Sequence, residues 1–226
     1  MTETPADGEL LARMYPQVFH VTDAGNGAGI RRHGLRSTRA LLELFEADEI
    51  TRAQTLAAAR PHNIELSHPL HGHASVRDQL PLSLHRLDEA LIDMSVEQWL
   101  ELLNSLVFFW PTLQRMQRLL QAPAYAQGVH RVLVIDTGEL MRRHPDRILL
   151  SAINTGATRP FAHPRGTDTF MPLGGFPLAQ RRRRLGRARA VAEVAVRDAV
   201  PDLDGLLVRV ERWQGPQAAE VEWRRR

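Results

Sequence analysis

The feature that most constrains this chain is a short apolar strand followed at once by a polar turn, a short helix and a glycine. The predicted strand is Val18–Thr22, the helix begins near Asn26, and Gly34 ends it. Because His20 and Thr22 are two residues apart on a strand, their side chains lie on the same face. The segment therefore predicts a histidine and a hydroxyl group side by side at the end of one strand of a sheet.

The remaining elements indicate an α+β protein. Short helices dominate the first half and strands the second half, without the regular alternation of a doubly wound sheet. Strands are expected at 106–110, 131–136, 149–153, 191–196 and 206–213. The chain has 226 residues, which suits a single domain over 1–226. We expect a loose, partly helical lead-in over 1–17, a loop over 60–73, and a long loop with a basic tract over 154–189.

Composition excludes several classes of protein. The chain is 43% hydrophobic and 24% charged, as globular proteins are. No apolar run approaches the roughly 18 residues that span a membrane, and the polar start lacks a signal peptide, so we expect no membrane partner and a cytoplasmic location. The chain has no cysteine, hence no disulfide framework and no thiol nucleophile. It also has no lysine, which excludes a lysine Schiff base and a P-loop lysine.

A carboxylate occurs in an unusual place near the end of the chain. Glu193 interrupts an otherwise apolar Ala/Val run, which is followed by the turn at Val200-Pro201 and by the last predicted apolar strand, Leu206–Val210. On a strand, Glu193 has the opposite parity from the valines that follow it, so it faces either a cleft or solvent. It is thus either a functional carboxylate or an exposed residue paired with an arginine. The middle of the chain adds an apolar-aromatic strand, Leu106–Trp110, that ends at a proline.

These three segments, in this order, resemble NAD-dependent ADP-ribosyltransferases of the bacterial DarT type. The resemblance covers most of the chain and implies an ART-like split antiparallel β-sheet core with a cleft, flanked by helices. It also implies NAD as the substrate and cofactor, and Glu193 as the catalytic residue. The residues that it assigns to NAD binding are His20, Thr22, Asn26, Gly34 and Leu35, with Phe109 or Trp110 available to stack on nicotinamide.

The chemistry of this family explains the residue types. Cleavage of the nicotinamide bond leaves an oxocarbenium-like ribose, which a nearby carboxylate stabilises more than it stabilises the ground state. His20 would orient the ribose, although a lone histidine can equally be a satisfied residue at a strand end. The family also uses an arginine between the first and middle motifs. Arg52, Arg60 and Arg77 lie in this interval, and Arg77 is preferred because it follows a predicted strand.

Other functions remain open at this stage. The leading interpretation is an ADP-ribosyltransferase acting on a macromolecule, with a DNA or RNA base as one acceptor and an antitoxin or immunity protein as a partner. The alternatives are an enzyme like the RNA 2′-phosphotransferases, or a non-catalytic domain that binds a nucleotide or a partner. The acceptor and the oligomeric state are not specified by the sequence.

Three further motifs each allow more than one interpretation. Arg181–Arg187 is a solvated face, or it holds the NAD pyrophosphate or a nucleic-acid backbone. The spacing of His68, His71 and His73 could suit a metal, but no carboxylates on a helix accompany it, so no metal site is expected. Gly25, Gly27 and Gly29 only partly match a dinucleotide fingerprint and lack a βαβ unit. Each of these motifs is unspecific alone.

Overall fold

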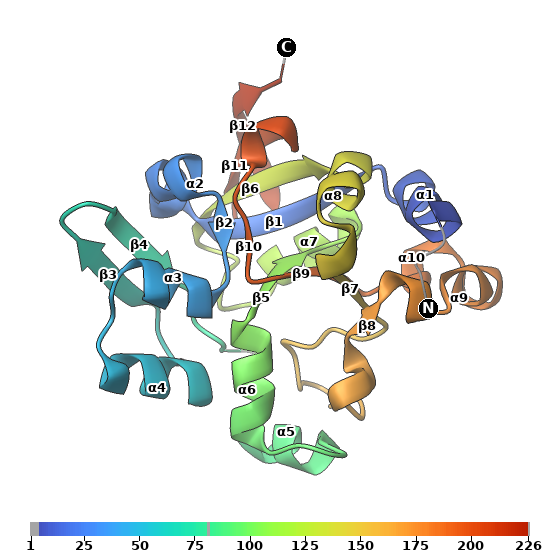
Figure 1. Cartoon of the computed structure of the whole chain (residues 1–226), viewed down its shortest axis with the longest axis horizontal. Coiled ribbons are helices and arrows are strands. Elements are labelled where there is room, and N and C mark those ends of the chain that lie inside the picture. Colours follow the sequence, from blue (N-terminus) through green and yellow to red (C-terminus); the bar gives the residue numbers. More distant parts are fainter. Residues whose placement is uncertain (1–4, 81, 226) are drawn as a thin grey trace.

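Two antiparallel four-stranded sheets form the centre of the protein (Figure 1). The structure is a computed structural model and describes residues 5–80 and 82–225. The first sheet has the order β1-β6-β11-β12 and the second has the order β5-β9-β7-β8. Their strands are β1 (Gln17–Asp23), β5 (Leu106–Phe109), β6 (Val129–Asp136), β7 (Ile148–Ser151), β8 (Met171–Pro172), β9 (Glu193–Arg197), β11 (Leu207–Gln214) and β12 (Gln217–Arg224).

The two sheets touch through one backbone bridge. Phe19 N–H donates to the carbonyl of Trp110 at 3.0 Å, and Trp110 N–H donates to the carbonyl of Phe19 at 2.8 Å. Apart from this bridge, β1 forms its backbone pairs with β6, and β5 forms its backbone pairs with β9. The sheets therefore separate on one side of this bridge, between β1 and β5.

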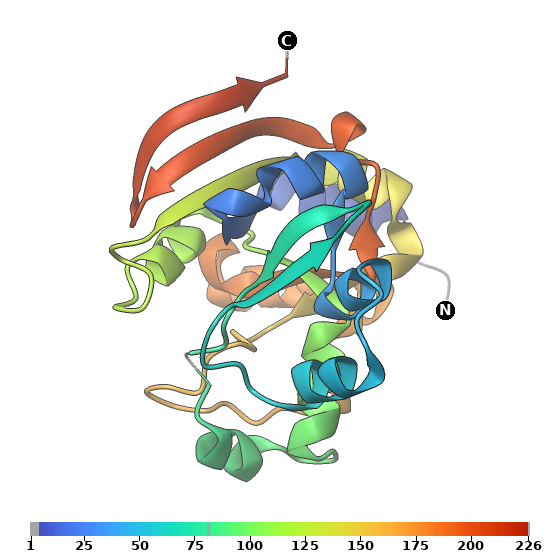
Figure 2. The same cartoon turned by 90° about the vertical axis from the view of Figure 1, so that its left-hand side faces the viewer.

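Ten helices and two small strand pairs surround the sheets in the described part of the chain (Figures 1 and 2). The helices are α1 (Pro5–Met14), α2 (Gly27–His33), α3 (Thr38–Leu44), α4 (Glu49–Ala57), α5 (Leu84–Ala90), α6 (Val96–Asn104), α7 (Leu113–Leu120), α8 (Thr137–Arg143), α9 (Leu178–Leu185) and α10 (Arg187–Ala190). The small pairs are β2 (Leu35–Arg36) with β10 (Ala199–Val200), and the hairpin of β3 (Ile64–His68) with β4 (Gly72–Val76). Antiparallel sheets with flanking helices confirm the coarse α+β expectation.

Strand β9 lies at the centre of the core because both of its faces are covered. Val194 and Val196 belong to the largest cluster of buried apolar residues, together with Phe109 from β5. Ala195, on the other face, packs in a second cluster with Trp99 of α6. Glu193 shares the parity of Ala195, so its side chain starts from a face that is covered by protein, not by solvent.

Three regions differ from the sequence expectation. The lead-in contains helix α1, in keeping with its expected partly helical character, but it is not loose, because Leu11, Met14 and Tyr15 are buried in the largest cluster. Leu11 and Met14 are three residues apart, so they share one helix face, and that face packs against the core. Residues 60–73, expected to be a loop, contain β3 and the turn of the hairpin, and the final segment forms the exposed edge strand β12.

Region 154–189 also needs a correction. Only its first part is an irregular loop, because the arginine-rich tract forms helices α9 and α10 beside α1, at the right of Figure 1. Leu178 and Ala190 anchor these two helices in the core.

Candidate functional site

A cleft of about 350 Å³ opens where the two sheets separate. Its wall combines β1, the turn and helix α2, β2, the end of β4, β5, the loop after β7 and the first residue of β9. This volume lies within the range of small-molecule sites. Most residues that the sequence predicted for the site line this cleft, namely His20, Thr22, Asn26, Gly34, Leu35, Arg77, Trp110 and Glu193.

His20 sits between the separating strands. Its Nδ1 lies 2.9 Å from the carbonyl of Phe108, and because a carbonyl only accepts, Nδ1 must carry the proton. Burial lowers the pKa of His20 to about 4, so the ring is neutral near pH 7. Nε2 is then an acceptor, and it has no hydrogen-bond partner among residues 5–80 and 82–225. The ring is thus oriented from one side and open on the other.

Asn26 and Thr22 brace the turn after β1. Both amide hydrogens of Asn26 are used, one to Thr22 Oγ1 at 3.0 Å and one to the carbonyl of Ser75 at 3.0 Å. Asn26 Oδ1 also accepts from Ser75 N–H at 2.8 Å, so the amide ties the turn to strand β4. Asn26 therefore shapes the cleft, whereas the Thr22 hydroxyl accepts from Asn26 and donates to no residue that the structure describes.

Gly34 and Leu35 shape the wall by backbone geometry. Gly34 has φ 71°, and a Cβ built there would lie 2.4 Å from the carbonyl oxygen of Val200. Only glycine combines this conformation with such a close approach. Leu35 continues the contact by pairing with Val200, and it is buried. These two positions hold the end of α2 and strand β2 against β10.

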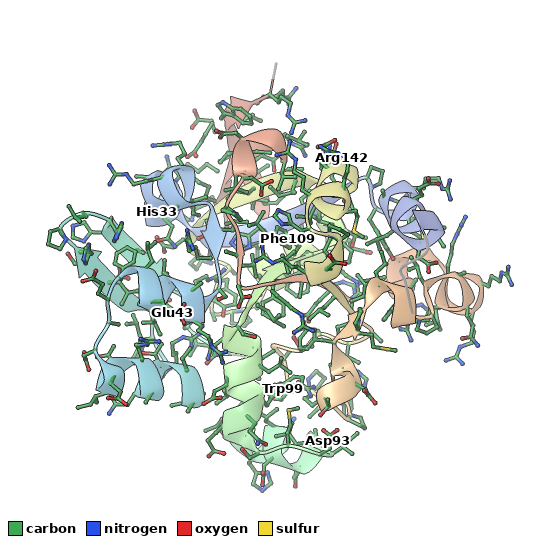
Figure 3. The ribbon with its side chains drawn as sticks, in the orientation of Figure 1. His33, Glu43, Asp93, Trp99, Phe109 and Arg142 are labelled. Atoms are coloured by element: carbon green, nitrogen blue, oxygen red, sulfur yellow. The ribbon has the colours of Figure 1, made fainter. Side chains whose placement is uncertain are left out.

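The aromatic residues of β5 divide between the cleft and the core. Phe108 and Trp110 line the cleft, as their shared parity predicts. Phe109 points into the core at the centre of the molecule and does not line the cleft (Figure 3). Its ring centroid lies 5.7 Å from that of His20, so it supports the imidazole from the core side. Of the two predicted stacking residues, Trp110 alone is accessible to a ligand in the cleft.

Glu193 is buried in the opposite wall, with 4% of its surface exposed. Its Oε1 accepts from the backbone N–H of Thr155 at 3.1 Å, and its Oε2 accepts from Thr155 Oγ1 at 2.6 Å. Burial raises the pKa of Glu193 to about 7, although the bonds from Thr155 and the charges of Arg115 and Arg165 partly oppose this. The carboxyl group is oriented and titrates near neutral pH.

The three candidate arginines occupy different environments. Arg52 lies outside the cleft wall and is 3.7 Å from Glu43 at the surface. Arg60 is buried, and its guanidinium donates to Thr55 and Arg77 carbonyls and to Asn104. Arg77 lines the cleft with its guanidinium 4.5 Å from the centre of the Tyr125 ring. Within the described chain, the Arg77 guanidinium has no hydrogen bond or ion pair, so it is the one of the three available to an anion.

Sequence reasoning missed Arg36 as a cleft residue. Arg36 lines the cleft, and its buried Nε has no hydrogen-bond partner among the described atoms. Its position directly after Gly34 and Leu35 could have indicated that it lies near the cleft. The sequence did not show which strand pairs with residues 35–36, so the direction of the Arg36 side chain could not be predicted. Arg36 and Arg77 come from different elements and give the cleft two guanidinium groups that form no salt bridge with any described residue.

The basic tract does not contribute to this cleft. None of the residues 181–187 lines it. Arg181 turns inward, where its Nε donates to the carbonyl of Ala190 at 2.7 Å and its guanidinium lies over Phe176. The other arginines of α9 are exposed. A role in holding the NAD pyrophosphate within the cleft therefore finds no support in this arrangement.

The histidines of the hairpin form an aromatic cluster. His68 and His71 stack with ring centroids 4.6 Å apart, and Phe45 packs against both. Over the described ranges, no group of three or more His, Cys, Asp or Glu side chains is arranged to hold a metal ion.

In the same ranges, no helix is both long enough and apolar enough to cross a membrane.

Comparison with known proteins gives one finding. A family model described as a family of unknown function, DUF7002, matches residues 16–207, from just before β1 to the start of β11. Every cleft residue discussed above lies within this range. A search of curated proteins found no match.

Proposed function

The chain belongs to DUF7002, a family of unknown function, so its activity has to be inferred from the cleft. We propose that the protein binds NAD and transfers ADP-ribose to an acceptor. One observation carries the proposal. His20 and Glu193, far apart in the sequence, line the same cleft. They are the two residues to which the DarT-type resemblance assigns ribose binding and catalysis. The separation of two antiparallel sheets beside β1 also agrees with the split core that the resemblance implies.

The polar groups of the cleft suit a dinucleotide. His20 Nε2 accepts a hydrogen bond from a ribose hydroxyl, and the free hydrogen of the Thr22 hydroxyl donates to a second ligand oxygen. The guanidinium groups of Arg36 and Arg77 have no salt-bridge partner in the described chain, and guanidinium binds phosphate oxygens in a bidentate manner. Trp110 supplies a flat apolar surface for the nicotinamide ring.

The proposed transfer of ADP-ribose exchanges one bond at ribose C1′ for another and needs no oxidant or reductant. The bond between ribose C1′ and the nicotinamide nitrogen breaks, and its electron pair leaves with nicotinamide. A nucleophile of the acceptor then forms a bond to C1′ and releases its proton to solvent. Glu193 stabilises the positive charge that develops on the ribose, which requires the ionised carboxylate. Because its pKa is about 7, turnover is expected to rise with pH through neutrality.

The test is to follow labelled NAD. The protein is incubated with NAD labelled in the adenylate part, alone and with single-stranded DNA, duplex DNA, RNA or a cell extract. The proposal predicts release of nicotinamide and transfer of label to one of these acceptors. Glu193→Gln should abolish most of the transfer, whereas Glu101→Gln, an exposed change on α6, should leave it intact.

Other outcomes would overturn the proposal in distinct ways. NAD binding measured by calorimetry without any turnover would favour a non-catalytic nucleotide-binding domain. Turnover that depends on RNA carrying a 2′-phosphate, and that releases this phosphate from the RNA, would favour the phosphotransferase class. No heat and no thermal shift at millimolar NAD would remove NAD from consideration, because a ligand of the folded state raises its stability by mass action.

A further inference from the structure

Arg165 is a buried guanidinium that the proposed reaction does not use. It is 1% exposed, and its Cζ lies 5.7 Å from the centre of the Trp99 ring, which projects from α6 (Figure 3). Its backbone is fixed on both sides, since its N–H donates to the carbonyl of Ala90 at 2.9 Å and its carbonyl accepts from Ile92 N–H at 3.0 Å. No carboxylate of the described chain forms a salt bridge with it.

The side chain of Arg165 instead holds one loop at three points. Its Nη1 donates to the carbonyl of Thr155 at 2.9 Å, Nη2 to the carbonyl of Ala157 at 3.2 Å, and Nε to the carbonyl of His163 at 2.9 Å. The segment 154–163 contains no helix or strand of its own. Its carbonyls have no strand partner, and one planar guanidinium donates to three of them, of which the contact with Thr155 is buried.

This loop carries the residue that holds Glu193. Thr155 donates through its backbone N–H and its hydroxyl to the two carboxylate oxygens of Glu193, while its carbonyl accepts from Arg165. A single residue thus links the guanidinium to the carboxyl group. The charged groups that act on Glu193 are Arg165 on this side and Arg115 of α7 on the other, and both favour the ionised carboxylate.

We propose that Arg165 is a positioning residue, which fixes Thr155 so that Thr155 holds the Glu193 carboxyl group in its orientation at the cleft. The catalytic consequence rests on the proposed function, but the placement of the carboxyl group does not. The competing explanation is that Arg165 only stabilises the loop. A conservative change separates the two, because lysine keeps the charge but cannot donate to three carbonyls arranged around a planar fork.

The experiment compares Arg165→Lys, Arg165→Gln, Thr155→Val and Thr155→Ser with a matched control. The control is Arg86→Gln, since Arg86 donates to Pro160 of the same loop at 2.6 Å but is exposed and forms no hydrogen bond with Thr155 in the described chain. The first readout needs no ligand: the side-chain carboxyl of Glu193, labelled with ¹³C and assigned by its loss in Glu193→Gln, is titrated by NMR. The second readout is kcat and KM for NAD.

Positioning predicts a specific pattern. In Arg165→Gln and Thr155→Val, the pKa of Glu193 rises further above about 7, and kcat falls about tenfold with KM nearly unchanged, because orientation acts on the transition state. Arg165→Lys keeps much of the pKa effect but loses kcat. Thr155→Ser restores both properties relative to Thr155→Val, and Arg86→Gln behaves as the wild type.

The outcomes separate this inference from the proposed function. A wild-type protein without transferase activity, in which the Arg165 and Thr155 variants still shift the Glu193 titration, would refute the function and support the positioning role. An active protein in which these variants keep the wild-type titration and kcat would refute the positioning role alone. Should Arg165→Gln fail to fold, Arg165→Lys decides the question, and the comparison of Thr155→Val with Thr155→Ser tests the contact between Thr155 and Glu193 separately.

Discussion

The two walls of the cleft are stabilised in different ways. The first wall is the continuous segment from β1 to β2, in which Asn26 bonds Thr22 four residues away and Gly34 ends the helix locally. The second wall is formed by β9 and the 154–163 loop, where Glu193 is held by Thr155 and that loop in turn by Arg165. The first wall is one continuous segment that is braced by β4, β5 and β10 through Ser75, Phe108 and Val200. In the second wall, two segments that are 38 residues apart meet through the contact of Thr155 with Glu193.

Burial also has different consequences in the two walls. It favours the neutral form of each titratable group, so it lowers the pKa of His20 to about 4 and raises that of Glu193 to about 7. His20 is consequently in one protonation state near pH 7, while Glu193 changes its state there. The comparison teaches that the first wall presents an imidazole in one fixed protonation state, whereas the second presents a carboxyl group whose charge is sensitive to pH and to packing.

The largest expected effect is on turnover. Glu193→Gln keeps the size of the side chain but removes its charge, so we expect kcat to fall on the order of a hundredfold to a thousandfold, with NAD affinity nearly intact. Steady-state kinetics and calorimetric titration measure the two quantities, with Glu101→Gln as the control. A large loss of affinity at unchanged kcat would place the role of Glu193 in the resting complex and not in the transition state.

The next effect concerns the pH dependence of stability. The folded-state pKa of Glu193 is about 7, above the usual 4.5, so the unfolded chain releases this proton first. The free energy of unfolding should therefore decline as pH rises from 4.5 through 7 and then level off, by roughly 3 kcal/mol at most. Urea denaturation at several pH values should show this decline reduced in Glu193→Gln. Equal slopes for both proteins would mean that the carboxyl group is not buried in solution.

A steric test addresses the first wall. Gly34→Ala should lower the free energy of unfolding by about 2 kcal/mol or more, because alanine resists the positive φ and its Cβ meets the Val200 carbonyl at 2.4 Å. Gly72→Ala is the control, since Gly72 also has a positive φ of 78° but no described atom lies within 4 Å of the place that its methyl group would take. The difference between the two variants isolates the close approach of β2 and β10, and equal losses would contradict it.

A smaller effect is expected at His20. His20→Ala removes one oriented acceptor for the ribose, so NAD affinity should weaken about tenfold, or roughly 1.4 kcal/mol. Calorimetry measures the affinity, and His62→Ala, an exposed change in the loop before β3, is the control. The NMR signals of His20 should also remain those of a neutral imidazole down to about pH 4. A ring that titrates near 6.5 would show that it is not enclosed.

The smallest effect on the cleft is expected from the basic helix. Replacing Arg182, Arg183 and Arg184 by glutamine should change NAD affinity by less than about twofold, because α9 does not line the cleft and exposed charges are screened over about 10 Å. If this helix contacts a nucleic acid, the same variant should bind DNA or RNA with a shallower salt dependence. A marked loss of NAD binding would contradict the separation of helix and cleft.

Local pattern was enough to predict much of the first wall. Alternation along β1 placed His20 and Thr22 on one face, and both residues line the cleft. Strands β6, β7, β9 and β11 were also expected from their apolar runs, because such runs depend only on neighbouring residues. Short hairpins and exposed edge strands carry weak patterns, and β3 and β12 were missed for this reason.

The tertiary structure alone decided the environment of Glu193. Parity left a cleft and solvent equally open, and the choice follows from the packing of β9 between two core clusters. Nothing near Thr155 in sequence indicates that it binds a carboxylate 38 positions away, or that Arg165 donates to its carbonyl. The sequence determined which side chains alternate along β1 and where the strongly apolar strands lie, since these are short-range properties of the backbone. Which charges face each other, and in which protonation state, depends on long-range burial that only the folded chain creates.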